Sequence, residues 1–529
     1  MATHQILLGG EWVTEATDNH FSASNPSTGD VLEDCYPVSS LPTLKRMASK
    51  ASEAARILNH LPADTIALFL NQHANEIDAN RIHISHIAHA ETGLPLEPRL
   101  VETEMNRTID QLRQAARCVI DRSWMQARID SQLNIRSIYE PVGGAVLTIG
   151  PNNFPLAYNG AAGGDFAAAI AARNPVIAKG HQLHPGTSRV LAECADRAAK
   201  AAGLPPGSFQ FFYQCDPEDG LSLVRMPEVT GVGFTGSRKA GLSLKQAADE
   251  TGTPIYLELS SINPIFVLPE ALAERATAIG TSIAKSMLAA SGQQCTCPGL
   301  LVVQEGPRGE ELQYTLCKYL GQTEPQVMLS RGGVEHLHKS IMKVINAGAE
   351  LLLGGQPVTD SHAKYKNTLL RICGEQFLNQ PDQFQQEMFG VAALIIQVQS
   401  DEEYLDIARV LDGNLTGTIH RSSSPSDDPL TQKLEAILRN KVGRLIHDDV
   451  PTGVSVNAAT VHGGPFPATG HPGFTAVGMP TAIHRFCALR CYDRVRSESL
   501  PPELRDKNPT GNMLRFVDGE WTNRDVVRA

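Results

Sequence analysis

A cysteine in a glycine-rich turn is the strongest candidate for a reactive group in this sequence. Cys295 lies in the segment 291–299, which follows a long stretch of helical character. A thiol at such a turn can act as a nucleophile once it has lost its proton. Most cysteines in loops of this kind are structural, so the assignment needs support from other residues. Cys297, two residues further on, is the rival nucleophile.

An acidic residue within an apolar strand supplies the first support. Glu258 lies between Leu257 and Leu259, at the end of a run that is expected to be buried. Charged side chains are seldom buried without a role, and a desolvated carboxyl has a raised pKa that suits a general base near neutral pH. The alternative is a structural carboxylate held in a salt bridge.

Two strand-to-helix turns carry further candidates. Asn153, in the segment 150–155, can donate its amide N–H to a developing oxyanion, or it can cap the following helix. Thr235, Gly236 and Ser237 precede a predicted helix, whose free backbone amides can bind a phosphate. The common dinucleotide pattern GxGxxG is absent from both turns.

These candidates lie in segments that connect a predicted strand to the next predicted helix. Short apolar runs alternate with helical stretches over residues 143–262, which predicts a parallel α/β sheet. A second α/β stretch extends from about 264 to 446, and it contains a helix predicted over 271–290, just before Cys295. The other expected elements are a hairpin region over 6–31, helices over 41–119, a half-buried strand over 133–140 and an edge strand from about 482.

The overall composition argues against several classes of protein. The chain has 529 residues and a formal net charge of −11, which is unusual for a nucleic-acid-binding protein. It has no apolar run of about 18 residues, so no membrane span is expected, and its start lacks the features of a signal peptide. The ten cysteines lack the spacing of a zinc site, so no metal is expected, and a reducing, cytoplasmic location fits them.

Taken together and in this chain order, these motifs resemble those of the aldehyde dehydrogenase superfamily. The segment around Cys295 resembles that family's nucleophile signature, and the segment around Glu258 resembles its glutamate signature. The resemblance continues at 178–181 and 387–390 and extends over essentially the whole chain. Less generic segments are similar to a subgroup that oxidises α-ketoglutaric semialdehyde, namely 153–157, 163–165, 184–188, 451–454 and 461–469.

The resemblance implies an α/β fold with a Rossmann-type cofactor domain, an α/β catalytic domain and a small β element for bridging and oligomerisation. The cofactor domain would comprise residues 1–124 and 142–262, and the catalytic domain would comprise residues 263–446. The bridging element would comprise residues 125–141 and 470–529. A homodimer or homotetramer is therefore the expected assembly.

The resemblance also implies roles for individual residues. Cys295 would attack the aldehyde carbon, and Asn153 with the Cys295 backbone amide would stabilise the oxyanion. Glu258 would activate the water that releases the acid from the thioester. A broad-specificity or fatty aldehyde dehydrogenase is the alternative enzyme. A non-catalytic binding or structural protein of the same fold is the alternative of another class.

The expected substrate is 2,5-dioxopentanoate, the semialdehyde of α-ketoglutarate, whose carboxylate lies remote from the aldehyde. Phe154 and Arg107 are the expected substrate-binding residues, with Arg107 facing that carboxylate. The alternative for Arg107 is a surface ion pair with Glu104 or Asp110.

NADP or NAD is the implied cofactor. Many NAD-preferring members of the family have a glutamate three residues after the position of Lys179, where this chain has Gln182. A neutral side chain does not repel a 2′-phosphate, so NADP+ is expected to be used at least as well as NAD+. The implied cofactor-binding residues are Ile149, Pro151, Lys179, His181, Gln182, Thr235, Gly236, Ser237, Glu387 and Phe389.

Overall fold

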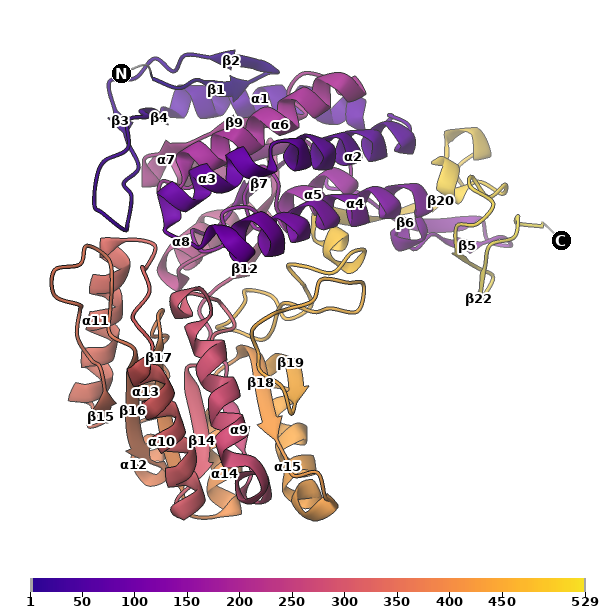
Figure 1. Ribbon diagram of the computed structural model, residues 1–529. Coiled ribbons are helices and arrows are strands. Elements are labelled where there is room, and N and C mark those ends of the chain that lie inside the picture. The colour runs from indigo at the N-terminus through magenta and orange to yellow at the C-terminus, as the bar shows by residue number, and fades with distance from the viewer. Residues whose placement is uncertain (1–2, 528–529) are drawn as a thin grey trace.

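The computed structural model describes residues 3–527, which form two bodies and a projecting arm (Figure 1). The upper body in this view contains the N-terminal part of the chain, and the lower body contains the region coloured from salmon to orange. The arm combines strands from residues 128–141 with the C-terminal segment. Helices alternate with strands in both bodies, so the predicted α/β fold class is confirmed.

The upper body is built on a seven-stranded sheet with the order β12-β11-β7-β8-β9-β1-β2. The strands from β12 to β9 are parallel, and the hairpin of β1 and β2 pairs antiparallel to β9 at one edge. The carboxyl ends of parallel strands lie at the same edge of a sheet, where α/β proteins bind ligands. The strands are β1 Ile6–Leu8, β2 Glu11–Val13, β7 Ala145–Ile149, β8 Val176–Lys179, β9 Phe209–Phe212, β11 Val229–Thr235 and β12 Ile255–Glu258.

Helices pack around this sheet, beside a small sheet with the order β10-β4-β3. The Ala-rich helix α5 is almost wholly buried, because its small side chains allow close packing against α2 and α4. The helices are α1 Leu41–Leu58, α2 Ala63–Ala79, α3 Arg81–Thr92, η1 Leu96–Glu104, α4 Met105–Asp121, α5 Gly164–Ala171, α6 Pro185–Ala202, α7 Pro217–Val224 and α8 Arg238–Asp249. The small strands are β3 His20–Phe21, β4 Tyr36–Ser39 and β10 Gln214–Cys215.

The lower body has a second seven-stranded sheet with the order β15-β16-β17-β14-β13-β18-β19, which is parallel except for β15. Its strands are β13 Ile265–Val267, β14 Leu300–Gln304, β15 Glu350–Leu353, β16 Thr368–Cys373, β17 Ala392–Val398, β18 Asn414–His420 and β19 Val442–His447. Its helices are α9 Pro269–Leu288, η3 Ala289–Gly292, α10 Pro307–Gln322, α11 Arg331–Asn346, α12 Gly374–Asn379, α13 Pro381–Phe384, α14 Asp401–Val410, η4 Pro425–Asp427 and α15 Asp428–Leu438.

The arm is a five-stranded sheet with the order β20-β6-β5-β21-β22. The buried Arg136 and Arg515 hold the loops that pack against it: Arg136 pairs with Asp506 at 2.7 Å, and Arg515 donates to the Arg505 carbonyl at 2.6 Å. The strands are β5 Arg128–Asp130, β6 Ile135–Pro141, β20 Cys487–Asp493, β21 Arg515–Val517 and β22 Glu520–Thr522, and the short helices are η2 Ser123–Met125, η5 Thr481–Phe486, η6 Ser497–Ser499 and η7 Pro502–Leu504.

The segment between β19 and η5 runs back from the lower body to the upper sheet. The Leu259 amide donates to the Ala468 carbonyl at 2.8 Å, and the Gly470 amide donates to the Leu257 carbonyl at 3.1 Å. These two bonds flank an antiparallel bridge between Glu258 and Thr469. The irregular segment is therefore held against the end of β12.

Most elements occur where the sequence predicts them, with shifted ends. The helix predicted over 271–290 is α9, which stops at Leu288, because Ala290 and Ser291 adopt positive φ angles of 51° and 56°. The strand predicted over 133–140 is β6. None of the helices within residues 3–527 combines the length and the apolar character that a membrane crossing requires.

Candidate active site

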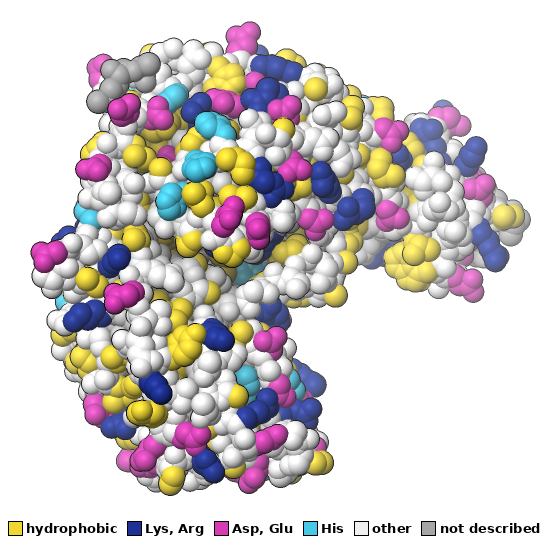
Figure 2. All heavy atoms as spheres, viewed as in Figure 1, with side chains coloured by type: hydrophobic (Ala, Val, Ile, Leu, Met, Phe, Trp, Pro, Cys, Tyr) yellow, Lys and Arg dark blue, Asp and Glu magenta, His cyan; other side chains and the backbone are white. Residues whose placement is uncertain are grey.

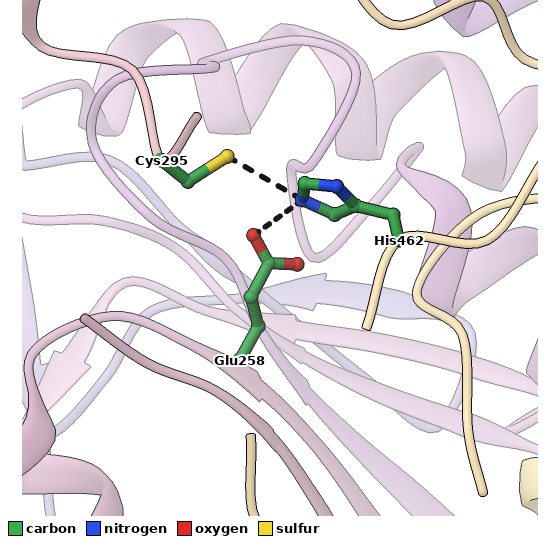
Figure 3. A group of neighbouring side chains, drawn as sticks. All are labelled: Glu258, Cys295 and His462. Carbon is green, nitrogen blue, oxygen red and sulfur yellow. Dashed lines mark hydrogen bonds and ion pairs between the residues drawn. The ribbon is translucent and has the colours of Figure 1, made fainter. Parts of the chain in front are cut away.

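Three side chains from distant parts of the chain meet at one place (Figure 3). Glu258 ends β12, Cys295 lies in the turn between η3 and β14, and His462 lies in the segment that runs back from β19. Their polar ends point toward one another. The sequence predicts the first two as catalytic residues, whereas it assigns no role to His462.

The imidazole lies between the thiol and the carboxylate. His462 Nε2 is 2.8 Å from Glu258 Oε1 and 3.4 Å from Cys295 Sγ. The His462 and Glu258 side chains are 3% and 2% exposed. One nitrogen cannot donate to a carboxylate and accept from a thiol in the same protonation state. Once Nε2 takes the thiol proton, however, the imidazolium N–H lies beside both the thiolate and the carboxylate, which stabilises the nucleophile.

The surroundings of Cys295 make such a base necessary. Burial raises the pKa of the Cys295 thiol well above its usual value, the negative charge of Glu258 raises it further, and the Arg107 charge opposes them. The isolated thiol would therefore stay protonated near neutral pH. Direct contact with the imidazole provides an acceptor for that proton.

Backbone geometry fixes the position of the cysteine turn. Asn263 Nδ2 donates to the carbonyls of Cys295 and Cys297 at 2.8 and 2.9 Å. Gly292 has a φ of 68°, and a Cβ atom there would lie 2.2 Å from the carbonyl carbon of Gly390. The turn can therefore approach the loop before β17 this closely only with glycine at position 292.

Asn153 lies beside this turn, in the loop after β7. Its Nδ2 donates to the Gln293 carbonyl at 2.9 Å, which occupies one of the two amide hydrogens. The Asn153 carbonyl accepts a hydrogen bond from Arg99 Nη2 at 3.0 Å. Hydrogen bonds thus hold both the side chain and the backbone of Asn153. One N–H of its side-chain amide remains available to an oxyanion.

Cys297 lies in a different environment from Cys295. Its Sγ lies 4.0 and 3.9 Å from the carbonyls of Met287 and Pro298, and burial raises its pKa to about 12, with Glu387 adding to the effect. Cys295 lines the neighbouring cavity, and Cys297 is not among the lining residues. The geometry therefore favours Cys295 as the nucleophile.

A cavity of about 450 Å³ extends from Cys295 to helix α4. Its walls combine aromatic and valine side chains with two arginines and two acids, so it suits a small organic ligand with an apolar part and a charged group. The lining residues are Arg99, Thr103, Glu104, Asn106, Arg107, Asp110, Phe154, Tyr158, Gln294, Cys295, Thr296, Gly453, Val454, Val456 and His462.

Arg107 projects into this cavity. Its Nη2 donates to the Tyr158 hydroxyl at 3.1 Å, and its guanidinium carbon lies 5.0 and 5.5 Å from the ring centroids of Tyr158 and Phe154. Within residues 3–527, Arg107 forms no ion pair, and its buried Nε has no hydrogen-bond partner. A half-buried cation that has no ion-pair partner is available to an anionic ligand.

The two acids considered as surface partners for Arg107 have other partners. Glu104 pairs with Arg99 at 2.5 Å and accepts hydrogen bonds from the amides of Leu156 and Ala157 at 2.8 and 3.0 Å. Asp110 lies 3.7 Å from Arg117 and accepts a bond from Gln114 at 2.6 Å. Neither acid therefore forms an ion pair with Arg107.

The expected cofactor residues on the upper sheet lie at the carboxyl ends of its strands. Ile149, Lys179 and Thr235 end β7, β8 and β11, and Pro151 follows β7. The Lys179 ammonium donates to the Gly180 carbonyl at 3.0 Å, and burial lowers its pKa. A desolvated ammonium with a single carbonyl partner has hydrogen-bonding capacity for a ligand.

The remaining cofactor candidates lie in the adjoining turns. His181 and the exposed Gln182 follow β8, and Gly236 precedes Ser237, whose Oγ caps α8 by accepting from the Ala240 amide at 3.4 Å. The N-terminus of α8 is exposed and carries two basic residues in its first turn, a setting that suits a phosphate.

Glu387 and Phe389 approach from the lower body. The Glu387 carboxylate accepts from the Ser261 amide at 3.4 Å, and burial raises its pKa to about 7 against the lowering effect of hydrogen bonds from Ser260 and Ser261. Phe389 is half-buried, next to the glycine that contacts the cysteine turn. The structure therefore brings both residues to the edge of the cysteine turn.

Sequence reasoning missed His462 and Arg99. His462 is 167 residues from Cys295 along the chain and lies outside any helix or strand, so no periodicity marks it. The one available signal was the Gly-rich segment 461–469 in which it occurs. Arg99 lies in the irregular turn η1, where no motif singles it out.

Comparison with known proteins extends these observations. Residues 12–436 match the family described as "Aldehyde dehydrogenase family". Alpha-ketoglutaric semialdehyde dehydrogenase 2 of Azospirillum brasilense is 35% identical over 98% of this chain and 99% of its own length. Alpha-ketoglutaric semialdehyde dehydrogenase of Acinetobacter baylyi is 33% identical over 92% of this chain and 93% of its own length. Aldehyde dehydrogenase C of Pseudomonas syringae, solved with NAD+ and octanal, has a TM-score of 0.78 over 93% of this chain and 96% of its own, with 18% identity.

Replacing each cysteine separately distinguishes the two candidate nucleophiles. Cys295→Ala should abolish aldehyde oxidation and leave cofactor binding intact, because it removes the thiol that faces the cavity. Cys297→Ala should retain most of the activity. NAD(P)H absorbance gives the rates, and fluorescence titration gives the cofactor affinity. Loss of activity in Cys297→Ala alone would contradict the assignment.

The carboxylate and the imidazole should affect different steps. Glu258→Gln should give a rapid burst of NAD(P)H followed by turnover that is about 10²–10⁴-fold slower, because thioester hydrolysis loses its base. His462→Phe should slow the burst itself, because the thiol loses its proton acceptor. Rapid-mixing kinetics separates the two phases. An unchanged burst rate in His462→Phe would show that the thiol is activated by another group.

Proposed function

Because this chain belongs to the aldehyde dehydrogenase family, we propose that it oxidises the semialdehyde of α-ketoglutarate, 2,5-dioxopentanoate, to 2-oxoglutarate. The observation that carries the choice of substrate is Arg107, a cation without an ion-pair partner among residues 3–527, in the cavity that leads to Cys295. The general activity of the enzyme is NAD(P)+-dependent oxidation of an aldehyde to a carboxylic acid.

The first chemical step uses the contacts around the thiol. His462 Nε2 accepts the proton of Cys295, and the resulting thiolate attacks the aldehyde carbon. The carbonyl oxygen becomes an oxyanion, which the free N–H of Asn153 and the Cys295 amide stabilise. One such donor lowers a barrier by about 3–4 kcal/mol. The aromatic walls formed by Phe154 and Tyr158 exclude water from the reacting carbon.

The residues at the carboxyl edge of the upper sheet fit a dinucleotide. Lys179 supplies an ammonium without an acidic partner among the described residues, suited to a ribose hydroxyl or a 2′-phosphate. The exposed start of α8 at Gly236 and Ser237 suits the pyrophosphate, and Glu387 suits the nicotinamide ribose. When bound, NAD(P)+ supplies the hydride acceptor for the oxidation.

The second chemical step releases the acid. The oxidised acyl group stays on Cys295 as a thioester, and a water molecule must attack it. Glu258 Oε2 is buried and has no hydrogen-bond partner, whereas its other oxygen contacts His462. The free oxygen can accept a proton from that water, so Glu258 acts as the base for hydrolysis.

The substrate's remote carboxylate matches the positive charge that Arg107 adds to the cavity wall. Arg107 presents its guanidinium edge there, and its stacking on Tyr158 and Phe154 holds the plane of the group. Arg99 lines the same wall but is committed to Glu104 and to the Asn153 carbonyl. Two relatives similar along almost their whole length are named for the same semialdehyde.

The assembly that we propose is a homodimer or a homotetramer. Strand β19 is the last strand of the lower sheet and β20 is the last strand of the arm, so each has an edge without a partner strand in residues 3–527. Leu489 on β20 is 59% exposed. Figure 2 shows a deep notch between the arm and the lower body, which a second copy would fill.

A cytoplasmic location fits the state of the cysteines. All ten are free thiols, including exposed Cys373 and Cys491. Free thiols in this number are typical of a reducing compartment.

Removal of the Arg107 charge tests the choice of substrate. Arg107→Ala should raise the KM for 2,5-dioxopentanoate by about 10- to 150-fold, which corresponds to a charged hydrogen bond of about 1.5–3 kcal/mol. The KM for pentanal should change little. Arg117→Ala is the matched control, because Arg117 lies on the same helix but is 67% exposed. Equal effects on both aldehydes would indicate a structural arginine and a broad or fatty-aldehyde specificity.

The end of β8 and the turn after it carry the residues on which our proposal for dinucleotide preference rests. Lys179 and His181 have no ion pairs among the described residues, and Gln182 is neutral. NADP+ should therefore give a kcat/KM at least equal to that of NAD+. Gln182→Glu should lower kcat/KM for NADP+ by about fivefold, as expected for one exposed charge interaction, and leave NAD+ nearly unaffected. A strong NAD+ preference in the unmodified enzyme would refute this proposal.

A further inference from the structure

The three catalytic side chains also form a compact set of metal-ligand atoms. Cys295 Sγ, His462 Nε2 and a Glu258 carboxylate oxygen all lie within 4.8 Å of one another (Figure 3). A thiolate, an imidazole and a carboxylate are the three protein ligands that zinc uses. This set does not follow a zinc sequence motif, because its members lie 37, 167 and 204 residues apart along the chain.

The separations are close to those of a tetrahedral ion. Zinc bonds of about 2.3 Å to sulfur and about 2.0–2.1 Å to nitrogen and oxygen place sulfur and nitrogen ligands about 3.5 Å apart, and nitrogen and oxygen ligands about 3.3 Å apart. The observed distances are 3.4 Å between Sγ and Nε2 and 2.8 Å between Nε2 and Oε1. The sulfur and the carboxylate oxygen lie within 4.8 Å of each other, so the Glu258 carboxylate must shift for all three atoms to bond one ion.

The charge of the site also suits a divalent cation. Three lone-pair atoms converge on one point, and a single proton cannot satisfy all of them at once. Glu258 Oε2 is buried without a hydrogen-bond partner, in a side chain that is 2% exposed. A thiolate and a carboxylate together balance the charge of Zn²⁺, which removes the penalty for an unpaired buried charge.

Access comes from the substrate cavity. Cys295 and His462 line it, and its mouth carries the exposed side chains of Thr103, Asn106 and Asp110. An ion held by the three ligands would turn its fourth position toward the space that the aldehyde must enter. Nearby Arg107 disfavours a cation electrostatically, but its charge is partly offset because the ligands neutralise the ion.

We propose that Cys295, His462 and Glu258 bind one Zn²⁺ per chain and that this ion inhibits the enzyme reversibly, in competition with the aldehyde. Binding forms a Zn–S bond and releases the thiol proton to solvent, with no change of oxidation state. Mg²⁺ and Ca²⁺ do not bind there, because they prefer all-oxygen sites. The ion is an inhibitor and not a resident cofactor, so the expectation of a metal-independent reaction is retained.

The proposal can be tested on the full-length enzyme without substrate. Calorimetric titration with ZnCl₂ should give one site per chain, and Co²⁺ should produce the intense near-ultraviolet charge-transfer absorption of a cobalt–thiolate bond. Cys295→Ser should remove that absorption. His462→Phe should weaken Zn²⁺ binding by at least about 100-fold, because losing a direct ligand costs more than the about 10- to 100-fold lost with an outer-shell partner. Circular dichroism establishes that each variant is folded.

Controls separate this site from adventitious binding to other thiols. Cys297→Ser should bind Zn²⁺ as the unmodified enzyme does. In the unmodified enzyme, Zn²⁺ should protect Cys295 from iodoacetamide, and peptide mass spectrometry should show exposed Cys373 still alkylated. Zn²⁺ inhibition that is unaffected by aldehyde concentration, or binding that is equal in Cys295→Ser and the unmodified enzyme, would overturn the proposal.

Discussion

The hydrogen bonds that hold the segment after β19 against strand β12 are the interaction on which the site depends. Leu257 and Leu259 bond through their backbone groups to Gly470 and Ala468, on either side of Glu258. These bonds keep the irregular segment beside the carboxylate, and the His462 amide is held by the Thr475 hydroxyl at 2.8 Å. Together these contacts place the imidazole of His462 beside both Glu258 and Cys295.

Burial of the site also affects the protonation of the Cys295 thiol. Burial favours the neutral thiol of Cys295, whereas the mechanism that we propose requires the thiolate. A partner that takes the proton and remains in contact resolves this conflict, because the imidazolium then lies between two negative groups. Arg107 adds a positive charge in the adjacent cavity, which lowers the thiol pKa, and this arginine forms no ion pair within residues 3–527.

Much of the fold could be predicted from local patterns. Apolar runs such as Ala145–Ile149 and Val176–Lys179 are strands because parallel strands covered by helices must be apolar on both faces. The exact end of α9 could not be predicted, because Ala290 and Ser291 adopt positive φ angles that their residue types do not favour, next to Gly292, which approaches Gly390 closely. Helical propensity at those two positions would have continued the helix.

The sequence by itself singled out Cys295, Glu258 and Asn153 as candidates for a nucleophile, a base and an amide donor, since each occurs in a local motif with a recognisable element beside it. It also determined the family. Only the tertiary structure decided that His462 contacts Cys295 and that Arg107 lacks an acidic partner within residues 3–527. The physical reason is that contacts between residues far apart along the chain depend on how sheets and loops pack, and local periodicity carries no record of that packing.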